Sequence, residues 1–77
     1  MPARQHDHKI EEQVGKNIRH RRKLIEMTQM QLANKIGVTF QQVQKYECGA
    51  ACVSPTRLVA IARAMECTVA SFFCGIM

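Results

Sequence analysis

The sequence predicts an all-α fold, a compact bundle of five helices. Three observations predict it. Apolar residues recur at helical spacing along most of the 77 residues. Four separate N-cap signals each precede an apolar set, and no stretch keeps the alternation of a strand for more than a few residues. A chain this short buries only a modest core, so we expect one folded domain, over residues 8–77. Residues 1–7 are expected to form a flexible arm.

The first helix is predicted over residues 8–26. Its apolar positions are Ile10, Val14, Ile18 and Ile25, which recur at nearly helical spacing. Basic side chains flank this apolar stripe without interrupting it. The pattern is that of an amphipathic helix with one face in the core.

Two short helices should follow, each opened by the same signal. Thr28 and Gln31, and then Thr39 and Gln42, have the Thr-x-x-Gln spacing of a capping box. Gly37 ends the first of the two helices, because glycine adopts a positive φ most easily. The second is predicted from Thr39 to Tyr46. Two capped helices joined by a Gly-Val turn are the sequence form of a helix-turn-helix.

The last two helices are predicted from N-cap residues and apolar spacing. Ser54 followed by Pro55 is an N-cap with proline at the first helical position. Apolar residues at helical spacing then predict a fourth helix through Met65. Thr68 should cap a fifth helix, whose apolar set is Val69, Phe72, Phe73 and Ile76.

Composition and charge narrow the function classes. Eleven Lys and Arg against six Asp and Glu give a net charge of +5. A small basic domain favours a polyanionic partner, either nucleic acid or an acidic membrane surface, although a solvated charged surface explains the charge equally well. No apolar run approaches the ~20 residues of a membrane span, and residues 1–9 lack the apolar stretch of a signal peptide. We therefore expect a cytoplasmic protein with no membrane partner.

The outward side of the third predicted helix is polar but carries little charge. Its residues are Phe40, Gln41, Gln42, Gln44 and Lys45. A glutamine amide donates and accepts in one plane, which matches the major-groove edge of adenine, and lysine can bind guanine or a phosphate. This face indicates DNA reading. The alternative is a solvated helix that happens to be rich in glutamine.

From residue 14 to residue 76, the chain resembles the helix-turn-helix family of lambdoid phage repressors and Cro proteins, the Xre type. The residues that carry the resemblance are Arg22, Thr28, Gln29, Leu32, Ala33, Gly37, Val38, Thr39, Val43, Tyr46, Glu47, Gly49, Pro55, Leu58, Ile61, Ala62 and Met65. Each is a weak signal alone, but their order and spacing together are specific. The family's fold is a compact five-helix bundle that reads DNA with its second and third helices.

The resemblance, together with the outward face of the third predicted helix, gives individual residues an expected role. Base contacts are expected from Thr39, Phe40, Gln41, Gln44 and Lys45. Phosphate contacts are expected from Thr28, Gln29 and Gln42, with Gln29 also bracing the recognition helix. Arg22 in the first helix should pair with Glu47 after the third.

The sequence also departs from the family pattern. Phe40 replaces a residue that is often polar, and it either packs on a thymine methyl or turns into the core; we expect the first. The loop over residues 48–53 lacks the Asn, Arg or Lys that relatives often place near the DNA backbone.

The end of the chain is apolar enough to suggest a homodimer, at least on DNA. Phe72, Phe73 and Ile76 are too many apolar residues for one side of a terminal helix, so we expect one Phe in the core and the rest at a dimer interface. The alternative is an apolar tail that lies frayed against its own domain. We therefore expect the protein to be a transcriptional regulator, a repressor that binds a palindromic site in double-stranded DNA. The alternative is an antitoxin that binds a toxin protein as well as its own operator.

An enzyme is not expected, because the acidic residues are scattered and no His is spaced to activate a Cys nucleophile. Nor do we expect a metal or another cofactor. Cys48, Cys52, Cys67 and Cys74 contain no C-x-x-C pair, and the three His lie far upstream. In a cytoplasmic protein we expect these thiols to be reduced and to behave as small hydrophobes.

Overall fold

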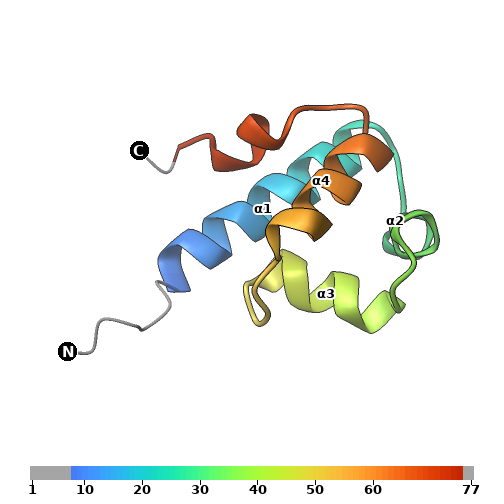
Figure 1. Cartoon of the computed structure of the whole chain (residues 1–77), viewed down its shortest axis with the longest axis horizontal. Helices are drawn as coiled ribbons and strands as arrows, with labels where there is room; N and C mark the ends of the chain where they lie inside the picture. The colour runs from blue at the N-terminus through green and yellow to red at the C-terminus, as the bar shows by residue number, and fades with distance from the viewer. Residues whose placement is uncertain (1–7, 76–77) are drawn as a thin grey trace.

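The computed structural model describes residues 8–75. The expectations that fall on residues 1–7, Ile76 and Met77 lie outside these described residues. Within them the chain forms four α-helices, α1 (His8–Leu24), α2 (Gln29–Ile36), α3 (Phe40–Cys48) and α4 (Pro55–Ala64), and a 3-10 helix, η1 (Val69–Phe73) (Figure 1). None of these helices combines the length and the apolar content that a membrane crossing requires.

The predicted fifth helix is therefore corrected to the single short 3-10 segment η1. The Thr68 side chain and carbonyl both bond to Ser71, which satisfies the backbone in the tighter i to i+3 pattern. The Asn17 amide then donates to the carbonyls of Phe72 and Cys74, at 2.7 and 2.9 Å. A side chain from α1 thus supplies donors to two backbone carbonyls at the end of η1.

The other helices begin at the residues that the sequence predicts. Thr28, Thr39 and Ser54 each have extended backbone and accept a hydrogen bond from the amide three residues later. At α2 the capping box is complete, since the Gln31 side chain also accepts from the Thr28 amide. The helix ends agree less well with the prediction, since α1 stops at Leu24 rather than residue 26. Just beyond this end, Glu26 has a left-handed backbone, with φ of 59°.

The core forms where α1 packs on α3 and on η1, while α2 packs on α3 and α4. The residues buried in it are Val14, Ile18, Leu32, Ala33, Ile36, Val43, Tyr46, Leu58, Ile61, Ala62, Met65 and Phe72. Ile10, which belongs to the predicted stripe of the first helix, is instead 42% exposed. This first turn of α1 lies at the left of the view in Figure 1, at the opposite side of the molecule from α2.

Candidate nucleic-acid interface

The candidate interface is built on α3, whose two sides differ sharply in burial. Val43 and Tyr46 lie in the core, on the side that contacts α1 and α2. Gln41, Gln44 and Lys45 are exposed on the other side, together with Thr39 at the N-cap. These four residues are among the five expected to contact bases.

The turn before α3 depends on Gly37, which has a left-handed φ of 75°. A Cβ on Gly37 would meet no atom within 4 Å, so the turn requires glycine for its backbone angle rather than for space. The amides of Gly37 and Val38 both bond to the carbonyl of Ala33, which closes the end of α2. This fixes the direction in which the chain enters α3.

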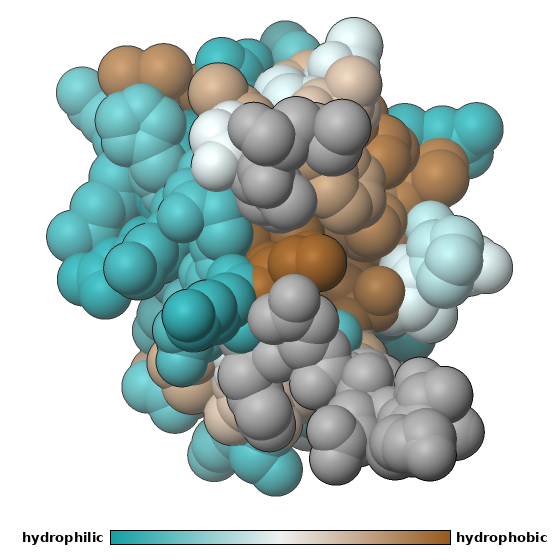
Figure 2. Space-filling view, turned by 90° about the vertical axis from the view of Figure 1, so that its left-hand side faces the viewer, coloured by the Kyte–Doolittle hydropathy of each residue, from teal (hydrophilic) through white to brown (hydrophobic). Residues whose placement is uncertain are grey.

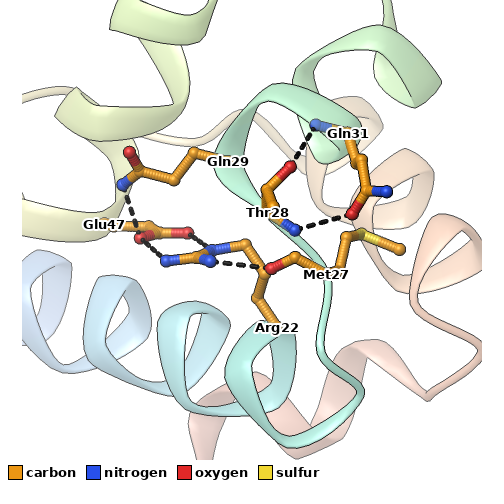
Figure 3. A network of polar contacts seen from close by, with 6 residues as sticks. All are labelled: Arg22, Met27, Thr28, Gln29, Gln31 and Glu47. Atoms are coloured by element: carbon orange, nitrogen blue, oxygen red, sulfur yellow. Dashed lines mark hydrogen bonds and ion pairs between the residues drawn. The ribbon is translucent and has the colours of Figure 1, made fainter.

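A buried ion pair then holds α3 against α1 (Figure 3). Arg22 donates from Nε to Glu47 Oε2 at 2.6 Å and from Nη2 to Oε1 at 3.0 Å. The remaining guanidinium nitrogen donates to the carbonyl of Met27 at 2.8 Å. Both side chains are almost completely buried. Arg22 and Glu47 thus stand where the resemblance places them, and the two parallel bonds fix their mutual geometry.

Gln29 ties the start of α2 into the same ion pair. Its Nε2 donates to Glu47 Oε1 at 3.0 Å, which agrees with its expected bracing of the recognition helix. A glutamine amide has two hydrogens, so this bond leaves one for another acceptor. Thr28 accepts from the Gln31 amide, and Gln42 is half-buried on α3.

Gly15, which had no expected role, lets α1 approach α3 closely. A Cβ on Gly15 would lie 2.4 Å from the carbonyl oxygen of Tyr46 and 2.7 Å from that of Glu47. Any larger residue would push α1 away from the helix that carries the reading face. The available signal was a glycine in the middle of a helical pattern, which often marks close packing.

A second feature without an expected role is an open groove of about 580 Å³ between the end of α1 and the first turns of α2 and α3. Its lining includes Arg19, Lys23, Glu26, Met30 and Phe40, together with members of the ion-pair network. We call it the α1–α2 groove. Phe40 is half-buried in its wall and is not a member of the core. The sequence signal for this groove was the row of basic residues beside the stripe of the first helix.

The residues that we expected at the dimer interface differ in burial. Phe72 is fully buried in its own core, so it cannot also contact a partner, and that expectation is corrected. Phe73 is 39% exposed, while Ile76 lies outside the described residues. Figure 2 shows an apolar area beside a hydrophilic one on the face that is turned to the left in Figure 1.

None of the four cysteines takes part in a disulfide, and most of them are exposed rather than packed in the core. Cys48, Cys52 and Cys74 are exposed and Cys67 is half-buried, because they lie at helix ends and in connections. Within the described part of the chain, no three His, Cys, Asp or Glu side chains gather as a metal site would require. The pKa of the Cys52 thiol is raised, chiefly by hydrogen bonding with Glu11 and to a smaller extent by burial and by the negative charge of Glu11.

The chain is similar in sequence to known helix-turn-helix transcriptional regulators. A family model described as helix-turn-helix matches residues 18–72. An uncharacterised transcriptional regulator in the ATPase CF(0) region of Rhodospirillum rubrum is 42% identical over 66 residues, which are 86% of this chain and 61% of that protein. An uncharacterised HTH-type transcriptional regulator of Sinorhizobium fredii is 50% identical over 60 residues, 78% of this chain and 42% of the other. The chain thus spans about half the length of the curated relatives it matches.

Two solved structures share the fold. The clp gene regulator of Corynebacterium glutamicum superimposes with a TM-score of 0.79 at 25% identity, covering 82% of each chain. The restriction-modification controller protein of Aeromonas hydrophila superimposes with a TM-score of 0.78, covering 80% of this chain and 94% of that one. Its identity is 24%, so this second likeness speaks for the fold alone.

Proposed function

This chain belongs to the helix-turn-helix family of DNA-binding transcriptional regulators, the Xre or lambda repressor type, and from that membership we propose that it is a cytoplasmic repressor that binds a palindromic operator as a dimer. The family is not an enzymatic one. The observation that carries the proposal is the exposed amide-rich side of α3, held from behind by a buried ion pair. A helix held in this way can enter a major groove without changing its angle to the rest of the domain.

In this proposal, bases are contacted by Thr39, Phe40, Gln41, Gln44 and Lys45. The two exposed glutamines suit adenine edges, and Lys45 suits guanine. Thr28, Gln29 and Gln42 contact phosphates, and these contacts position α3 without selecting a sequence. Support for this division comes from exposure, since Gln41, Gln44 and Lys45 all face solvent.

The experiment is selection of bound duplexes from a random pool. We expect an enriched palindrome whose half-sites lie ~10–10.5 base pairs apart, as two recognition helices related by a two-fold axis require. A reporter gene placed behind the selected site should be repressed by the protein. Enrichment of a single unrepeated half-site would contradict the dimer, and activation of the reporter would contradict the repressor.

Gln41→Ala tests the base contacts directly. It should weaken binding to the selected duplex by ~1–3 kcal/mol and leave binding to random DNA nearly unchanged. Asn34→Ala is the matched control, since it removes an exposed amide from α2 rather than from α3. If Gln41→Ala weakens binding to both duplexes equally, Gln41 does not read bases.

A further inference from the structure

The α1–α2 groove carries positive charge that the domain does not use internally. Arg19 and Lys23 stand four residues apart on α1, both are exposed, and neither forms an ion pair within residues 8–75. Arg22 also borders the groove, but Glu47 neutralises it. Glu26 is the acidic residue of the lining. The two unpaired cations therefore outnumber the single exposed carboxylate.

The groove opens beside the helices that carry the reading face. Its walls include Thr28 and Gln29 at the start of α2 and Phe40 at the start of α3. At the opposite end of α3, the connection over residues 50–53 has no charged side chain. The groove therefore places exposed positive charge of α1 beside the N-terminal end of α3, where Phe40 lies.

Resting on the proposed function, we propose that this groove seats the sugar-phosphate backbone of one strand of the bound duplex, with Arg19 and Lys23 each neutralising a phosphate. Charge complementarity argues for this occupant. Residues four apart on a helix have Cβ atoms about 5–6 Å from one another, and both side chains are long, so they can reach successive phosphates of one strand. Met30, which is 54% exposed, supplies an apolar wall for a deoxyribose ring.

The test measures affinity against salt concentration for the wild type, Arg19→Gln, Lys23→Gln and the double variant. Each neutralised phosphate contributes about −0.9 to the slope of log affinity against log salt, so each single change should make the slope shallower by about 0.9 and the double change by about 1.8. The change should be the same on the selected duplex and on random DNA, because phosphates carry no sequence information. Glu26→Gln should strengthen binding to both, since it removes repulsion of the phosphates.

Arg63→Gln is the matched control, because Arg63 is an exposed arginine of α4 outside this groove. It should keep the wild-type slope, and thermal unfolding should show that every variant is folded. A wild-type slope in the double variant would overturn the proposal, and so would a loss confined to the selected duplex. Wild-type protein that binds no duplex at all would instead overturn the proposed function, so the two failures are distinguishable.

Discussion

At the scale of single residues, the Cys52 thiol is set apart from the other exposed thiols by Glu11. Hydrogen bonding with Glu11 favours the protonated thiol, and the carboxylate charge disfavours the thiolate, so the pKa is raised. The thiolate is the reactive form. At pH 8, Cys52 should therefore react with a disulfide reagent more slowly than Cys48 and Cys74. The difference should shrink as the pH rises through the pKa of Cys52.

Glu11→Ala should remove this difference, and mass spectrometry of the labelled peptides would measure it. Glu66→Ala, which removes another exposed carboxylate at the end of α4, should leave the order of reaction unchanged. If Cys52 reacts as fast as the other exposed thiols in the wild type, Glu11 does not control it.

The ion pair of Arg22 and Glu47 gives a second prediction at this scale. Glu47→Ala leaves a buried guanidinium without its counter-charge and should lower the free energy of unfolding by ~3–5 kcal/mol. Replacing both residues with leucine should cost less than Glu47→Ala, because no charge is then left buried. Urea denaturation measures both. A Glu47→Ala protein as stable as the wild type would mean that water reaches Arg22 easily.

At the scale of helices, Gly15 sets how closely α1 and α3 approach. Helix propensity alone predicts that Gly15→Ala stabilises the protein by about 0.5–1 kcal/mol. The Cβ would however overlap two backbone carbonyls that no rotamer change can move. We therefore expect Gly15→Ala to destabilise the protein by about 1–3 kcal/mol, the usual cost of overpacking.

Gly37→Ala is the comparison for this substitution, because its added Cβ meets nothing within 4 Å and only the positive φ opposes it. Gly37→Asn should therefore be tolerated better than Gly37→Ala, since asparagine adopts the left-handed region more readily. Gly15→Asn should show no such relief. Thermal unfolding of the four variants separates a steric requirement from a conformational one.

At the scale of the whole molecule, the first turn of α1 and the segment η1 each leave an apolar side chain exposed. These are Ile10 and Phe73, at 42% and 39% exposure. In the proposed dimer, Phe73→Lys should leave the fold and half-site binding intact but abolish cooperative filling of a palindrome. The reason is that a lysine at the centre of a small apolar contact must lose water on association.

Val59→Lys is the matched control for this substitution. Val59 on α4 is also 39% exposed, so the change puts the same charge on an equally exposed apolar position. Cooperativity measured by titrating one-half-site and two-half-site duplexes should survive Val59→Lys. If Phe73→Lys also retains it, the proposed dimer does not use η1.

Short-range signals were enough to place most of the helices and the exposed face of the candidate site. Thr28, Thr39 and Ser54 start helices because each side chain reaches an amide only three residues away. The outward amides of α3 were also predictable, because Val43 and Tyr46 fix which side of that helix faces the core. Such hydrogen bonds and periodicities depend on neighbours in the chain, so the sequence by itself determined them.

Contacts between distant segments decided the rest. Which of two adjacent phenylalanines is core depends on α1 and α4 packing against η1, and that packing buries Phe72 and leaves Phe73 exposed. The Asn17 side chain donates to the carbonyl of Phe72, 55 residues further along the chain, and Gly15 matters only because the carbonyls of α3 lie against it. The α1–α2 groove likewise exists only where three helices converge. Burial and close approach are properties of segments that meet in space, so only the tertiary structure decided them.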